Sequence, residues 1–125
     1  MPQQGKLKII EEDGVTIVSF LEVAFLDETS IKDLGNELES LVKDKQGINL
    51  IINFANVDYL SSAVLGRLVK VYKLVATNKG KIKLCGIKNN ILQVFKITRL
   101  DKMFEIQPDV EKAVKSFKSF KLFKK

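Results

Sequence analysis

The sequence contains no histidine and no tryptophan, and Cys85 is its single cysteine among 125 residues. Without an imidazole there is no Ser-His-Asp or Cys-His nucleophile pair and no zinc motif that needs a histidine ligand. One cysteine cannot form an internal disulfide, and without a Cys-x-x-Cys partner Cys85 is most simply a buried small apolar residue. Only two prolines and 46% hydrophobic residues are typical of an ordinary folded domain.

Long apolar runs are also missing. Residues 1–10 hold no stretch suited to a signal peptide, and no window approaches the roughly 18 uncharged apolar residues that a membrane span requires. We therefore expect a cytoplasmic protein. At this length we also expect one domain over residues 1–125, with a core at about 5–117 and a C-terminal tail at 118–125.

Acidic residues are outnumbered 15 to 21 by Lys and Arg, which gives a formal net charge of +6. The excess is local: residues 111–125 contain six lysines and one glutamate, whereas residues 1–110 contain 15 basic and 14 acidic residues. Because the body is nearly neutral, no basic face extends across it, and nucleic acid is not expected as a partner.

The tail at 118–125 alternates lysines with Phe120 and Phe123. A repeat of three residues drifts around an α-helix and gives no single apolar stripe. We interpret the tail as a frayed, solubilising chain end. The alternatives are contact with an anionic membrane surface and docking to an acidic partner.

Hydrophobic patterning predicts a mixed α/β domain. Two β-rich runs at 6–11 and 15–20 flank Asp13-Gly14, a dipeptide that suits a tight hairpin turn. Residues 48–54 are apolar almost throughout, as expected for a central strand buried on both faces. Before this strand, Thr29 or Ser30 is a candidate cap for a helix that ends near Gly47.

Further elements follow the central strand. A second helix is expected at 62–78 with Ser61 or Ser62 as its cap, and a strand at 81–85 completes a right-handed crossover with a parallel strand pair. A third helix over 91–98, an edge strand over 103–106 and a last helix over 108–117, opened by Asp109, come after it. The predicted fold class is α/β, a mixed sheet of four to five strands with an N-terminal β-hairpin and about four helices packed against it.

The segment 56–68 joins the central strand to the second helix, a place where open sheets commonly present binding residues. Ser61 and Ser62 stand at the helix start, where the first N–H groups lack intrahelical acceptors and the helix dipole is positive. A phosphate on Ser62 would be received by these groups. The simpler alternative is a plain serine cap.

The same segment resembles the STAS domain family, specifically the anti-sigma factor antagonists of bacterial partner-switching pathways. The family pattern reads roughly Asp-Ser-Ser/Thr-Gly-Leu-Gly after the central strand, and many members read Ser-Ser-Ala-Gly-Leu. In this sequence the pattern falls on Ser61 at the Asp position, Ser62 at the phosphorylated serine, Ala63, Val64 in place of a Gly, and Leu65-Gly66. The hairpin opening, Leu26-Asp27, residues 81–86 and residues 94–106 also follow the family pattern in order, so the resemblance covers roughly residues 5–117.

The resemblance implies a protein–protein switch rather than an enzyme. Unphosphorylated family members bind a GHKL-type serine kinase that doubles as an anti-sigma factor. The kinase phosphorylates the serine with ATP, and a PP2C-type phosphatase restores it. Ser62 is then the expected phosphorylation site, with Ser61 as the alternate acceptor because a helix start read from sequence can shift by one residue. The implied partner-binding residues are Asp27, Asp58, Tyr59, Leu60, Ser61, Ser62, Ala63, Leu65 and Gly66.

Other interpretations stay open beside this one. Asp27 reads most simply as a turn or cap residue, Asp58 as loop chemistry and Arg67 as a solvated side chain. A second candidate function is a non-phosphorylated STAS scaffold, such as an accessory subunit of a membrane lipid or anion transporter. An enzyme is disfavoured because the sequence has no Walker loop, metal cluster or histidine, and neither a cofactor nor a metal is expected.

Overall fold

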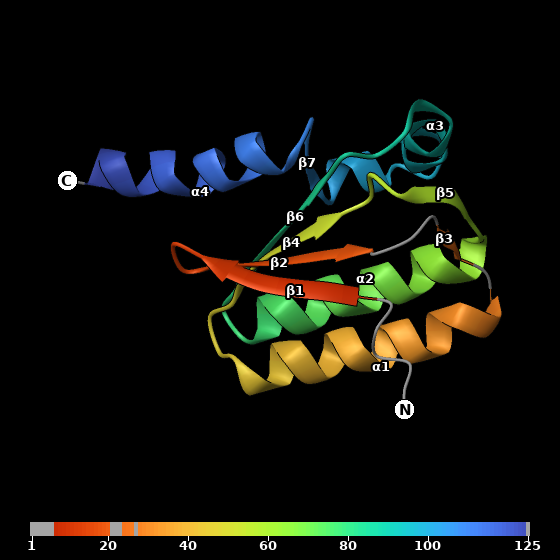
Figure 1. Ribbon diagram of the computed structural model, residues 1–125, viewed down its shortest axis with the longest axis horizontal. Helices are drawn as coiled ribbons and strands as arrows, with labels where there is room; N and C mark the ends of the chain where they lie inside the picture. Colours follow the sequence, from red (N-terminus) through yellow and green to blue (C-terminus); the bar gives the residue numbers. More distant parts are fainter. Residues whose placement is uncertain (1–6, 21–23, 27, 125) are drawn as a thin grey trace.

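The computed structural model of the protein describes residues 7–20, 24–26 and 28–124, and Figure 1 shows their arrangement. The chain opens with a β-hairpin of β1 (Leu7–Glu12) and β2 (Val15–Phe20), paired antiparallel. The turn between them places Asp13 at φ 56° and Gly14 at φ 79°. Two consecutive positive φ angles are what a two-residue hairpin turn requires, and Asp-Gly tolerates them. The predicted hairpin is therefore confirmed.

The hairpin joins a parallel sheet in the order β1-β2-β4-β6-β7. β4 (Asn49–Asn53) lies at the centre, between β2 and β6 (Lys81–Cys85), and β7 (Glu105–Gln107) pairs with β6. A helix, α2 (Ser62–Thr77), connects β4 with β6, so this crossover has the predicted strand, helix and strand order. The five-stranded mixed sheet confirms the predicted fold class.

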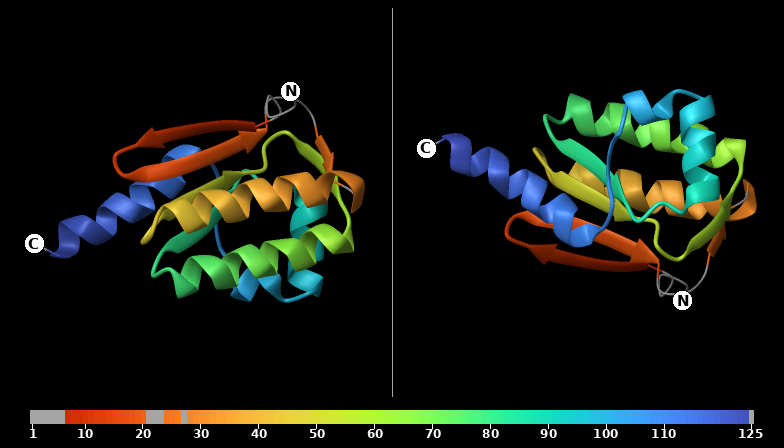
Figure 2. Two further views of the ribbon diagram at one scale, coloured as in Figure 1. Left: turned by 90° about the horizontal axis from the view of Figure 1, so that it is seen from below. Right: turned by 90° about the horizontal axis from the view of Figure 1, so that it is seen from above.

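Helices cover both faces of the sheet. α1 (Glu28–Asp44) and α2 lie side by side on one face, and α4 (Val110–Lys124) crosses the other (Figures 1 and 2). Successive side chains of a strand point to opposite faces of the sheet, so β4 contributes to the hydrophobic core on each face. Leu50 and Ile52 belong to the larger core under α1 and α2, whereas Ile51 belongs to the smaller core under α4. The central strand is buried on both sides, as predicted.

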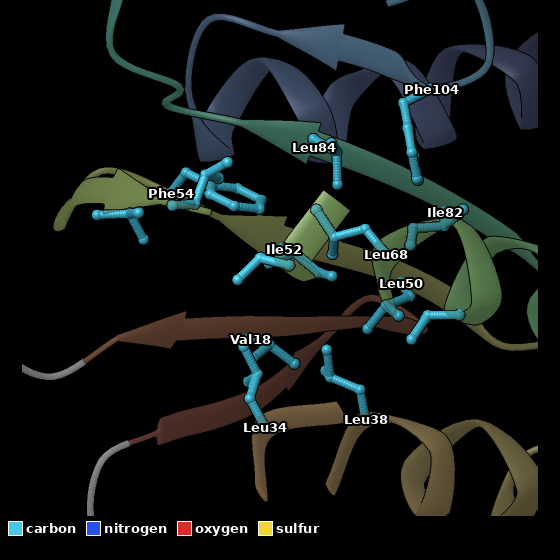
Figure 3. Packing of buried hydrophobic residues seen from close by; sticks show 14 of the residues in the cluster. Val18, Leu34, Leu38, Leu50, Ile52, Phe54, Leu68, Ile82, Leu84 and Phe104 are labelled. Carbon is cyan, nitrogen blue, oxygen red and sulfur yellow. The ribbon is translucent and has the colours of Figure 1, made fainter. Parts of the chain in front are cut away.

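The larger core contains a chain of aromatic contacts at the end formed by α3 (Asn89–Ile97). Ring centroids are 6.3 Å apart for Phe20 and Phe54, and 6.5 Å apart for Phe54 and Phe95. Phe95 in turn contacts Phe104 at 6.3 Å in an edge-on geometry. Figure 3 shows Phe54 and Phe104 beside the aliphatic residues of β4 and β6. These contacts attach α3 and the following loop to the sheet.

Asp109 and Lys83 fix the helix α4 on its face of the sheet. Asp109 Oδ1 accepts the Lys112 N–H at 2.8 Å, which confirms Asp109 as the residue that opens the last helix. The almost buried Lys83 donates to Ser116 Oγ at 2.6 Å and lies 3.2 Å from the Glu105 carboxylate. Burial alone would raise the pKa of Glu105, but hydrogen bonds from Gln107 and Lys83 lower it. The Glu105 carboxylate therefore stays charged and remains the ion-pair partner of the buried Lys83.

Several predicted boundaries are wrong. α1 begins at Glu28, so Thr29 and Ser30 lie inside the helix rather than before it. An acidic residue such as Glu28 suits the first position of a helix, because the helix dipole is positive there. The edge strand is displaced from 103–106 to Glu105–Gln107, because a 3-10 helix, η2 (Leu100–Lys102), precedes it. α4 continues to Lys124 instead of ending near residue 117, and its end extends past the sheet (Figure 2). Without Gly or Pro after residue 108, nothing local ends this helix.

A second, two-stranded sheet was not predicted. β3 (Ala24–Leu26) pairs in parallel with β5 (Val57–Leu60), the segment interpreted from sequence as a loop. Each of these strands has at most four residues, which is too short for a period of two to be recognised.

In the described part of the chain, no helix is long and apolar enough to cross a lipid bilayer.

Candidate functional site

The connection between β4 and β5, which leads to the start of α2, is hydrogen-bonded to the main sheet. The Phe54 N–H donates to the Cys85 carbonyl at 2.8 Å, and the Val57 N–H donates to the Phe54 carbonyl at 2.9 Å. The Asn56 amide nitrogen also donates to the Phe20 carbonyl at 2.7 Å. These bonds attach the end of β4 to both neighbouring strands, and the chain continues from there through β5 to the start of α2.

The two serines at this junction have opposite environments. Ser61 is the N-cap residue, with extended φ −91° and ψ 169°, and its carbonyl accepts the Val64 N–H at 3.0 Å. Its Oγ is buried and has no hydrogen-bond partner. Ser62 is the first residue of α2 and is exposed. Of the two candidates, Ser62 is the serine that a kinase could reach.

The N-terminus of α2 lacks a side-chain cap. Ser61 makes no capping hydrogen bond, and the first turn contains no acidic residue. Ser61, one of the two predicted cap residues, therefore has the N-cap position and backbone but makes no capping bond through its hydroxyl. Ser62 is the first helical residue and not the cap, so the plain-cap alternative for Ser62 is wrong. The positive end of the helix dipole is left without a negative neighbour in its first turn.

Replacing Ser61 with alanine is expected to leave the free energy of unfolding unchanged within about 0.5 kcal/mol, or to raise it. The substitution removes a buried hydroxyl that has no partner. Asp109→Ala provides the matched control, because Asp109 does cap a helix and its loss should cost about 1 kcal/mol. Urea unfolding of both variants measures the difference. Equal losses would show that Ser61 caps α2 after all.

The preceding strand, β5, is buried at both ends and open to solvent in its middle. Asp58 forms an ion pair with Lys88, the N-cap residue of α3, so it belongs to a strand and joins two elements rather than serving in a loop. Tyr59 is 49% exposed, whereas Leu60 is buried. Tyr59 therefore adds an exposed aromatic side chain to the strand that leads to Ser62, and Leu60 belongs to the larger core.

The remaining motif residues also differ in how far they are exposed to solvent. Leu65 is buried in the larger core, and Ala63 is half-buried. Gly66 is exposed, and a Cβ added there would meet nothing within 4 Å. Ser62 and Gly66 are four residues apart and share one helix face. Asp27, the last predicted partner-binding residue, lies outside the described residues.

Arg67 is not the solvated side chain expected from sequence. Its Nε donates to Glu39 Oε2 at 3.0 Å, and its NH2 group donates to Asn36 Oδ1 at 2.9 Å, both on α1. Gly35 makes room for it, because a Cβ at residue 35 would lie 2.4 Å from Arg67 Nε. The sequence offered one signal for this contact, a glycine inside a helix. Arg67 thus fixes α2 against α1.

Neither a metal-ligand cluster nor a reactive thiol is present among the described residues. Within the described residues, no group of three or more His, Cys, Asp or Glu side chains could hold a metal ion. Cys85 is buried, and burial together with the nearby Asp109 raises the pKa of its thiol to about 12. The thiol is therefore protonated and unreactive at neutral pH.

Comparison with known proteins gives consistent matches. The sequence pattern of the STAS domain matches residues 6–113. BtrV of Bordetella bronchiseptica, described as an anti-sigma factor antagonist, is 28% identical over 114 residues, 91% of this chain and 96% of BtrV. The structure of an anti-sigma-factor antagonist (STAS) domain protein from Planctomyces limnophilus has a TM-score of 0.82 at 20% identity, covering 88% of this chain and 96% of that chain.

A further similar structure is that of the Bacillus cell fate determinant SpoIIAA in its phosphorylated form. It has a TM-score of 0.66 at 14% identity, covering 89% of this chain and 98% of that chain. At these identities the two structures establish a common fold.

Proposed function

The chain belongs to the STAS domain family, and from this premise we propose that it is an anti-sigma factor antagonist switched by phosphorylation of Ser62. The unphosphorylated protein binds an anti-sigma factor that is also a GHKL-type serine kinase. Phosphorylation by this kinase ends binding, and a PP2C-type phosphatase restores it. The observation that carries the proposal is the exposed Ser62 at the uncapped, positive end of α2.

The physical chemistry of the site supports this switch. A phosphate on Ser62 adds close to two negative charges next to the unpaired N–H groups of the first turn. These groups stabilise the phosphoserine in the free protein. In a complex, the same charges would be buried against a surface that receives a neutral hydroxyl, which is unfavourable. One modification therefore stabilises the free form and destabilises the complex.

The proposed docking surface is narrower than the sequence motif. We place the direct contacts at Tyr59, Ser62, Ala63 and Gly66, which are exposed or half-buried. The open space around Gly66 lets a partner backbone approach the helix closely. The buried members of the motif, Leu60 and Leu65, act by holding this surface in place.

Incubation with the cognate serine kinase and ATP tests the proposal. Mass spectrometry should find one phosphate on Ser62 and none on Ser61, because the Ser61 oxygen is buried. Ser62→Ala should remove the phosphate, and the matched variant Ser61→Ala should keep it. The phosphorylation switch is wrong if neither serine is modified. Retrieval of a membrane transporter instead of a soluble kinase would favour the accessory-subunit alternative.

A further inference from the structure

β1 has a free edge. It pairs with β2 on one side, and among the described residues no strand pairs with its other side. Both views of Figure 2 show the hairpin as a border of the molecule. Ile9 and Ile10 are each 41% exposed on this edge strand. An open edge of backbone N–H and C=O groups with exposed apolar side chains is a template for pairing with another strand.

The two faces of β1 carry different charges. Lys8, Ile10 and Glu12 share the face on which α4 lies, because Ile10 is opposite Ile17 and Glu12 is opposite Val15, both members of the core under α4. On the other face, Glu11 forms an ion pair with Lys45. Within the described residues, Lys8 and Glu12 have no ion-pair partner.

These three residues match a second copy of the same strand. Antiparallel pairing about a two-fold axis perpendicular to the sheet must place residues of the same face opposite each other. With the axis at Ile10, Ile10 meets Ile10, and Lys8 meets Glu12 on both sides of it. With the axis at Ile9, Lys8 instead meets Ile10, and Glu12 meets Lys6, which lies outside the described residues. Among the described residues, the Ile10 register is the one that places opposite charges face to face.

We propose that two copies of the chain associate through β1, in the antiparallel register centred on Ile10, and join their sheets into one continuous sheet. The occupant is a second copy because the opposite charges arise from the strand's own sequence. The contact is isologous, so each copy uses the same edge and the assembly closes at two. Ser62 takes no part in the contact, so the proposal is independent of the proposed function.

Sedimentation of the full chain over micromolar to millimolar concentrations tests this contact. The unmodified protein should form a reversible dimer. Lys8→Glu and Glu12→Lys should each weaken association about tenfold, because symmetry makes each change replace two attractive pairs with two repulsive ones. The double variant Lys8→Glu/Glu12→Lys should restore association. Lys73→Glu, an equal charge change on an exposed residue of α2, should have no effect.

Two results would overturn the dimer proposal. One is a monomer at every concentration. This result would also be found if the free edge of β1 paired with a strand of another protein instead of a second copy. The other is a dimer that resists both single charge reversals, which would place the contact elsewhere. Circular dichroism at the working temperature verifies that each variant is folded. A monomer that is still phosphorylated on Ser62 would contradict the dimer alone, whereas an unmodified dimer would contradict the phosphorylation switch alone.

Discussion

Ser62→Asp is expected to weaken binding to the anti-sigma factor by about 100-fold, which corresponds to roughly 3 kcal/mol. The carboxylate places a permanent negative charge at the exposed start of α2, where the first turn has none. Binding would transfer this charge from water into an interface made for a hydroxyl, and the lost hydration would not be replaced. Isothermal titration calorimetry with the purified anti-sigma factor measures the change in Kd.

Two controls separate this effect from misfolding. Ser62→Ala should bind within about threefold of the unmodified protein, because it removes the hydroxyl without adding charge. Ser62→Asp should unfold at the same denaturant concentration as the unmodified protein or a higher one, since an acidic residue in the first turn gains about 0.3–1 kcal/mol from the helix dipole. Full binding by Ser62→Asp would contradict the electrostatic basis of the switch.

Phe95→Ala is expected to lower the free energy of unfolding by about 3–5 kcal/mol. Phe95 is completely buried and contacts both Phe54 and Phe104, so its removal leaves a cavity in the middle of the aromatic chain. A loss of this size is a large fraction of the stability of a single domain. It would also loosen α3, which carries the Lys88 partner of Asp58 beside the candidate site.

Urea unfolding followed by circular dichroism gives the loss for Phe95→Ala. Ile97→Ala is the matched control, because Ile97 belongs to the same helix but is 79% exposed. Its truncation should change the free energy of unfolding by no more than about 0.5 kcal/mol. If Phe95→Ala cost less than about 1 kcal/mol, the aromatic chain would be repacking instead of holding α3 in place.

Most of the main sheet could be predicted because its signals are local. Asp13-Gly14 indicates the hairpin turn, and the apolar residues 48–54 indicate the central strand. The Ser61-Ser62 pair also identified the start of α2 correctly. The second sheet could not be predicted in the same way, because β3 and β5 are short and pair with each other across a long stretch of the chain.

The sequence by itself determined the order of the main-sheet strands and the α-helices, the near-neutral body and the position of two hydroxyls at a helix start. The tertiary structure decided which hydroxyl is available: Ser61 turns its oxygen into the protein and Ser62 faces solvent. It also decided that Arg67 is a structural residue, because its partners on α1 lie 28 and 31 positions away in the chain. Periodicity reports the face of an element on which a residue lies, whereas burial and pairing depend on which elements pack against that face.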